Sequence, residues 1–169
     1  MPFEPKRILT TLARHGVDVI VVGGIGGVLQ GSPLLTDDVD VVPLLKRPNL
    51  DALAAALNEL NAALMSAEAP GGSIRIDWNG KDLQRWIVDF RFINLATDYG
   101  QLDLIHRPGG TDGYADLAPA AIAVEIDGME LKVAALEDII RSKEAVGRDR
   151  DLQQVPTLRT LLEATRRRG

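Results

Sequence analysis

The chain has 169 residues, of which 46% are hydrophobic and 25% are charged, as in an ordinary soluble globular protein. It contains no cysteine, which excludes disulfide scaffolds and thiolate chemistry, and its net charge of −5 argues against a general nucleic-acid coat. No apolar run approaches the length of a membrane span, and segment 1–16 lacks the apolar core of a signal peptide, so we expect a cytoplasmic protein.

The first part of the chain predicts three helices and two strands around a glycine-rich segment. Apolar residues at helical spacing predict a helix over 4–15, which Gly16 is placed to end. The β-branched run 17–22 predicts a buried strand, and segment 24–31 predicts a short helix packed closely through its glycines. Alternating acidic and apolar residues over 38–42 predict a second strand with one polar face. Pro48 and Asn49 then open a helix rich in alanine and leucine.

The second part predicts hairpins followed by helices. A loop is expected at 69–73, and strands over 88–97 and 100–106 are joined by a tight turn at Asp98 and Tyr99. Asp127 and Gly128 indicate a two-residue hairpin turn between two further strands. The remainder predicts two helices with a break near Gly147, and the arginines at 166–168 are interpreted as a solvated helix end. Interspersed strands and helices with antiparallel hairpins favour a mixed α/β or α+β domain.

The glycine cluster within 23–31 follows a predicted strand, as phosphate-binding loops do, but it fits neither of two standard loops. A dinucleotide fingerprint has a third glycine where this chain has Leu29. A P-loop has lysine and then serine or threonine where this chain has Ser32 and Pro33. Both patterns therefore fail at the residue that carries their chemistry.

The acids that follow the cluster favour a metal site. Asp38 and Asp40 are two residues apart on a predicted strand and so share one face, whereas Asp37 has the opposite alternation and is expected to point away. Carboxylate oxygens are the ligands that Mg²⁺ prefers. A solvent-facing strand of alternating polarity is the alternative for these two acids.

The order of these features resembles the nucleotidyltransferase superfamily, which has the polymerase-β-like fold. That pattern has an apolar residue and Gly-Gly, here 22–24, then a spacer, here of thirteen residues, then an acid–apolar–acid unit, here 38–40. The phrase YGQLDL, which contains Asp103, and the segment 136–158 resemble small stand-alone members of the abortive-infection and toxin–antitoxin type. The resemblance covers about 17–160 and departs from the pattern at Asp37, where a basic residue is frequent.

The resemblance implies a mixed twisted sheet flanked by helices, an α/β (α+β) fold. It implies a single nucleotidyltransferase-like domain over 1–169, with its core at about 17–133 and a C-terminal helical segment at about 135–166. It also implies a metal-dependent enzyme that transfers an NMP from an NTP, ATP among the candidates, to a hydroxyl group.

The resemblance also assigns roles to individual residues. Mg²⁺ or Mn²⁺ would be held by the carboxylates of Asp38, Asp40 and Asp103, the last from a neighbouring strand. The nucleotide would be bound by Gly23, Gly24, Ser32 and Lys143. Supporting roles fall to Thr36, Arg148, Arg150 and Asp151.

Several of these residues also have a purely structural explanation. For the two glycines the alternative is close packing of a helix against the sheet. For Ser32 it is an ordinary Ser-Pro turn. For Lys143 it is a surface lysine paired with Glu144 or Asp138, and for the arginines near it a structural ion-pair cluster.

Three functions follow from these observations. The first is an enzyme with a macromolecular acceptor, a tRNA end or a protein side chain, in a toxin–antitoxin setting with a cognate partner. The second is an enzyme that modifies a small molecule, as antibiotic-modifying relatives do. The third is a non-catalytic module with this fold, an antitoxin or an RNA-binding partner, which retention of all the acids disfavours. None of the three requires a membrane.

Overall fold

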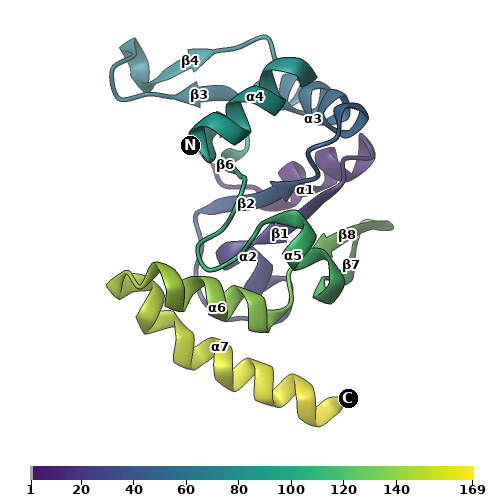
Figure 1. Cartoon of the computed structure of the whole chain (residues 1–169), viewed down its shortest axis with the longest axis vertical. Coiled ribbons are helices and arrows are strands. Elements are labelled where there is room, and N and C mark those ends of the chain that lie inside the picture. The colour runs from purple at the N-terminus through teal and green to yellow at the C-terminus, as the bar shows by residue number, and fades with distance from the viewer. Residues whose placement is uncertain (1) are drawn as a thin grey trace.

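The computed structural model describes residues 2–169, which build one eight-stranded mixed sheet (Figure 1). The strand order is β4-β3-β5-β6-β2-β1-β8-β7, in which β2 runs parallel to β6, β1 runs parallel to β8, and the other neighbours are antiparallel. The sheet confirms the mixed α/β class that the sequence predicts. The strands are β1 (Val19–Val22), β2 (Asp38–Pro43), β3 (Ala63–Met65), β4 (Ser73–Arg75), β5 (Phe92–Thr97), β6 (Gly100–Ile105), β7 (Ile122–Ile126) and β8 (Met129–Val133).

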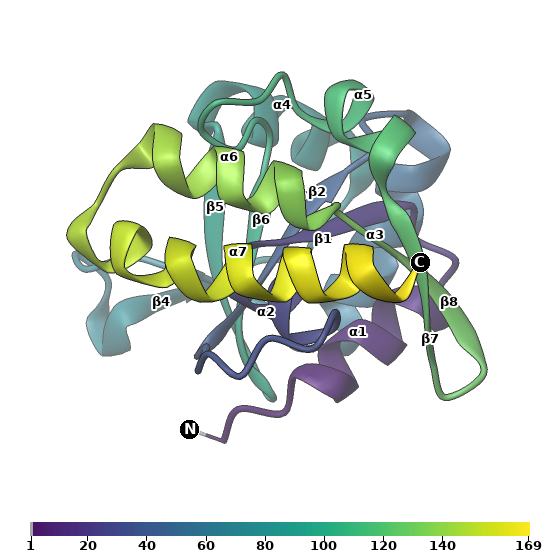
Figure 2. The same ribbon diagram turned by 90° about the horizontal axis from the view of Figure 1, so that it is seen from below.

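Helices cover both faces of the sheet. One face packs against α1 (Pro5–Arg14), α3 (Arg47–Glu59) and α4 (Gly80–Phe90), and the other packs against α6 (Leu136–Val146) and α7 (Asp149–Arg168). Helix α2 (Gly23–Val28) contributes Ile25 to the first core and turns Gly26 and Gly27 toward α6 and α7. Figure 2 shows α6 and α7 lying side by side across the strands. Short turns of helix complete the chain at η1 (Pro70–Gly72), α5 (Tyr114–Leu117) and η2 (Ala118–Ala120). Within 2–169, no helix combines the length and the apolar character needed to cross a membrane.

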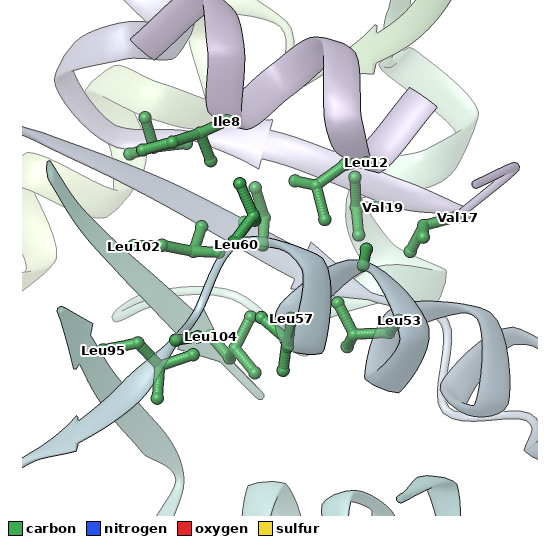
Figure 3. Close-up of a cluster of buried hydrophobic side chains, with 14 of the residues drawn as sticks. Ile8, Leu12, Val17, Val19, Leu53, Leu57, Leu60, Leu95, Leu102 and Leu104 are labelled. Atoms are coloured by element: carbon green, nitrogen blue, oxygen red, sulfur yellow. The ribbon is translucent and has the colours of Figure 1, made fainter. Parts of the chain in front are cut away.

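The larger core lies between the sheet and the helices α1 and α3. Figure 3 shows leucines from α3 meeting Ile8 and Leu12 of α1 and the leucines of β5 and β6. Val39 and Val41 of β2 enter this core. Because side chains alternate along a strand, Asp38 and Asp40 emerge on the opposite face, the one that α2 and α6 cover. The alternation of this one strand therefore sets both the core and the position of the acids.

The structure differs from the sequence prediction around residue 90. A strand was predicted over 88–97, but α4 continues to Phe90 and β5 begins only at Phe92. Leu83 and Ile87, one turn apart, are buried, and the Asn79 side chain caps the helix by accepting from the Asp82 N–H. This helix is hard to predict because its polar, charged residues obscure a narrow apolar stripe. The short strands β3 and β4, of which β4 forms the edge of the sheet, were not predicted either.

The two predicted hairpin turns are confirmed. Asp127 and Gly128 both have positive φ between β7 and β8, as a two-residue turn of this type requires. Thr97 pairs with Gly100 across the turn at Asp98 and Tyr99. The break between the last two helices also lies where expected, at Gly147, which ends α6 in the left-handed conformation.

Candidate active site

Three carboxylates gather on the face of β2 and β6 that is turned toward α2 and α6. Asp38 and Asp40 come from β2, and Asp103 of β6 lies directly opposite Asp40 in the parallel pairing. One oxygen from each side chain can be chosen so that all three lie within 4.8 Å of one another. Asp103 is only 8% exposed. Acids from distant parts of the chain therefore form one compact cluster.

Burial and mutual repulsion raise the pKa values of two of these carboxylates. The pKa of Asp40 is raised to about 8, first by burial and then by the charges of Asp38 and Asp103. The pKa of Asp38 is also raised, by burial and then by Asp103 and Asp37. Because three hard oxygen donors lie together and repel one another, the donor set fits a divalent cation such as Mg²⁺ or Mn²⁺.

Neighbouring polar side chains hold the acids in place. Thr36 Oγ1 donates to the backbone carbonyl of Asp38 (3.2 Å). Asn94 Nδ2 and Gln101 Nε2 both donate to Asp103 Oδ1, over 2.9 and 3.0 Å. Sequence reasoning missed these two amides. The signal for both was available, since Gln101 shares a face with Asp103 and the predicted hairpin turn places Asn94 across from it.

Gly23 and Gly24 lie where β1 meets α2, against the acids. Gly23 has a φ of +65°, and a Cβ added there would lie 2.2 Å from Asp40 Oδ2. A Cβ on Gly24 would lie 2.9 Å from Thr36 Oγ1. Both glycines line the cleft over the acids, where Gly23 leaves room for Asp40 and Gly24 leaves room for Thr36. Gly26 and Gly27 instead pack against α6 and α7, as the sequence suggests.

Ser32 is the one predicted site residue that the structure does not bring to the site. It is buried outside the cleft, and its Oγ accepts from the Leu34 N–H over 3.2 Å. Its Cβ lies close to Gly27, on the α7 side of α2. The Ser-Pro turn, which the sequence left open as the alternative, accounts for these contacts.

A cleft of about 510 Å³ opens over the acids, and the C-terminal helices supply its basic residues. Lys143 of α6 is largely buried, its Nζ donates to Gln154 Oε1 (2.8 Å), and it lies 3.8 Å from Asp151 Oδ1. Burial lowers the pKa of Lys143. Arg148 Nε lies 2.7 Å from Asp151 Oδ2, and Arg150 lines the same cleft.

Lys143 does not form the ion pairs expected of a surface lysine at this position. Glu144 and Asp138, the two acids considered for it, are instead engaged by Arg159 and Arg141. Lys143 is thus held inside the cleft by residues of α7. Gln154, which contacts it, was not foreseen, because only the packing of α7 on α6 brings the two together.

Loss of the Asp151 charge is expected to loosen this junction. Asp151 is 3% exposed and binds both Lys143 and Arg148, so Asp151→Asn should lower the free energy of unfolding by about 2 kcal/mol. The control is Glu144→Gln, which removes an exposed pair with Arg159 and should change stability by less than about 0.5 kcal/mol. Urea denaturation of both variants measures the difference, and equal effects would contradict the buried role of Asp151.

Comparisons with known proteins agree on the fold. No protein-family model and no curated protein matches the sequence. Among solved structures, the lincosamide antibiotic adenylyltransferase LnuA, bound to lincomycin, is similar with a TM-score of 0.61 at 13% identity, over 95% of this chain and 98% of that one. A putative nucleotidyltransferase from Thermotoga maritima has a TM-score of 0.53 at 18% identity, covering 96% of each chain.

A further similar structure is ANT(2″)-Ia in complex with adenylyl-2″-tobramycin. Its TM-score is 0.51 at 14% identity, over 94% of this chain and 87% of that one. At these identities the likeness concerns the fold, which is that of nucleotidyltransferases, as the sequence resemblance implies.

Proposed function

We propose that this protein, which has a nucleotidyltransferase fold and three clustered acids in a cleft of about 510 Å³, is a metal-dependent nucleotidyltransferase. It transfers an NMP from an NTP to a hydroxyl group of an acceptor. The observation that carries the proposal is the cluster of Asp38, Asp40 and Asp103 beside Gly23, in a cleft that also presents Lys143. A non-catalytic module has no need of three mutually repelling carboxylates, two of which have raised pKa values.

The chain supplies a distinct group for each part of the substrate. Asp38, Asp40 and Asp103 would hold one or two Mg²⁺ or Mn²⁺ ions. When bound, such ions neutralise the triphosphate and activate the attacking hydroxyl. The open backbone at Gly23 and Gly24 leaves space for phosphate groups.

The basic side of the cleft completes the nucleotide site. Lys143 is positioned by Gln154 and Asp151 to place one positive charge near the outer phosphates. Arg150 and Arg148 extend this side, with Asp151 keeping Arg148 in place.

The acceptor is either a macromolecule or a small molecule. The sequence resemblance favours a tRNA end or a protein side chain, with a toxin–antitoxin partner. The second candidate is modification of a small molecule, and it draws on two neighbours whose names describe antibiotic-modifying activity, LnuA and the tobramycin-bound protein.

Calorimetry with each of the four NTPs, with and without Mg²⁺, tests the core of the proposal. We expect binding of at least one NTP that requires the metal and is lost in Asp38→Ala. Release of pyrophosphate in the presence of total RNA, cell protein or a small-molecule panel then tests transfer. Absence of metal-dependent binding for every NTP would overturn the proposal.

Metal binding should release a proton at neutral pH. The pKa of Asp40 is raised to about 8 in the metal-free protein, so below that pH a bound cation must displace its proton. Affinity for Mn²⁺ is therefore expected to rise up to about tenfold per pH unit between pH 6 and 8 and to level off above. Calorimetry in two buffers of different ionisation enthalpy counts the proton, and a flat affinity across this range would contradict the raised pKa.

A further inference from the structure

One wall of the cleft carries three exposed side chains that neither the metal site nor the nucleotide site uses. Arg91, Phe92 and Arg107 line the cleft at its β5 and β6 side. Gly23 lies at the end of β1, and the sheet order β5-β6-β2-β1 places the acids of β2 and β6 between the two sides. If the triphosphate lies beside Gly23, as proposed above, the wall at β5 is left for the acceptor. The inference that follows rests on that proposed function.

The β5 wall is positively charged without compensation. Within residues 2–169, neither Arg91 nor Arg107 has an ion-pair partner. The acids of the cleft outside the cluster, Asp138 and Asp151, are both paired with cations. The pKa of His106 is lowered by burial and then by both arginines, so their fields overlap there. Such a wall attracts an anion and repels a polycation.

Phe92 adds a flat apolar surface to this wall. It is 59% exposed, although its neighbour Ile93 is buried in the core. Phe92 shares its face with Asn94, which donates to Asp103, and the two positions are about 7 Å apart along the strand. An exposed ring beside guanidinium groups suits the stacking of a nucleobase.

The backbone at Arg91 indicates that its side chain matters. Arg91 ends α4 with φ +65° and ψ −36°, where glycine would be free of strain. The Arg91 carbonyl accepts from the His106 N–H over 2.7 Å, which holds this conformation. A residue kept in a sparsely populated conformation at a cleft points to a use for its side chain.

We propose that the acceptor is a nucleotide unit, with its phosphate on Arg91 and Arg107 and its base on Phe92. Its hydroxyl oxygen attacks the α-phosphorus of the NTP, and the bond from that phosphorus to the bridging oxygen of the β-phosphate breaks. Pyrophosphate leaves, and the hydroxyl proton passes to Asp103. A free mononucleotide and the 3′ end of an RNA share this chemistry.

Anisotropy of a fluorescent RNA hexanucleotide measures acceptor binding without any turnover. The double variant Arg91→Gln/Arg107→Gln should weaken binding at least tenfold and reduce the slope of log K against log salt by about 0.7, as expected for one phosphate of a single strand. Phe92→Ala should weaken hexanucleotide binding several-fold, whereas Phe92→Tyr, which keeps an aromatic ring, should bind as tightly as the wild type. The double variant Arg75→Gln/Lys46→Gln removes two exposed cations outside the cleft and should leave binding unchanged.

Arg91→Gly tests whether weaker binding comes from loss of the side chain or from loss of the fold. Glycine relieves the positive φ, so this variant should be at least as stable to urea as the wild type while it binds the hexanucleotide several-fold more weakly. Unaltered hexanucleotide binding in Arg91→Gly and in the arginine pair would overturn the inference.

Label transfer from an α-labelled NTP then separates the acceptors. Transfer to the hexanucleotide alone identifies an RNA end, and transfer to a nucleoside 5′-monophosphate as well identifies a nucleotide in general. Equal transfer to an unphosphorylated nucleoside, an aminoglycoside or a lincosamide would contradict the inference. Metal-dependent NTP binding is measured in the wild type and in the same variants. If the wild type shows no such binding, the proposed function is overturned. If Arg91→Gln/Arg107→Gln keeps this binding and its KM for the acceptor is unchanged, only the acceptor assignment is overturned.

Discussion

Asp40→Asn is expected to reduce nucleotidyl transfer at least a thousandfold while making the metal-free protein more stable at pH 8.5. The asparagine cannot supply the anionic oxygen that a divalent cation needs, and a thousandfold loss corresponds to about 4 kcal/mol of transition-state stabilisation. The pKa of Asp40 is raised to about 8, so between its unfolded value and that pH the folded state binds more protons than the unfolded state. Stability therefore falls as the pH rises through this window, and the amide removes the loss.

The gain in stability should be about 2 kcal/mol at pH 8.5 and close to zero near pH 4. Urea denaturation at several pH values in chelator measures it, and pyrophosphate release measures activity. Asp37→Asn is the matched control, because Asp37 is an exposed neighbouring acid that does not line the cleft. It should keep activity within about threefold, since an exposed charge that does not line the cleft has a small effect even beside Asp38. A stable Asp37→Asn that loses activity as fully as Asp40→Asn would contradict the assignment.

Gly23→Ala is expected to have the second largest effect. The added Cβ would lie 2.2 Å from Asp40 Oδ2, and the alanine must also hold a φ of +65°. The carboxylate has to move, so we expect transfer to fall at least a hundredfold and the free energy of unfolding to fall by about 2–3 kcal/mol. Activity assays and urea denaturation measure the two effects.

Gly16→Ala separates the cost of the positive φ from the cost of the close contact with Asp40. Gly16 has a φ of +69°, nearly that of Gly23, but a Cβ there would have no atom within 4 Å. Its substitution should cost only the backbone strain, about 1 kcal/mol, with activity unchanged. If both variants lose the same stability and Gly23→Ala remains active, the close approach of Asp40 to the backbone has no functional importance.

Local patterns predicted much of the site. Asp38 and Asp40 could be assigned to one face of a strand because alternation is a property of the strand itself. The resemblance to nucleotidyltransferases added Asp103. The parallel pairing that places it opposite Asp40 joins strands more than sixty residues apart in the chain, and no local pattern encodes it.

The errors arose where tertiary contacts decide. Ser32 lay in the expected stretch, but packing of α2 against α7 turns it away from the cleft. The end of α4 was misassigned, because residues 88–90 suit a strand as well as a helix. Arg91 and Arg107, one wall of the cleft, drew no attention because single arginines carry no spacing signal.

The attachment of Lys143 to α7 makes the candidate site depend on the last part of the chain. The carboxylate cluster is complete once β6 has been made, but Asp151 and Gln154, which hold the lysine in the cleft, come later in the chain. Val155 and Leu158 then anchor the same helix to the sheet face beneath. Under the proposed function, the residues that would hold a metal thus precede in the chain those that would fix a charge near the outer phosphates.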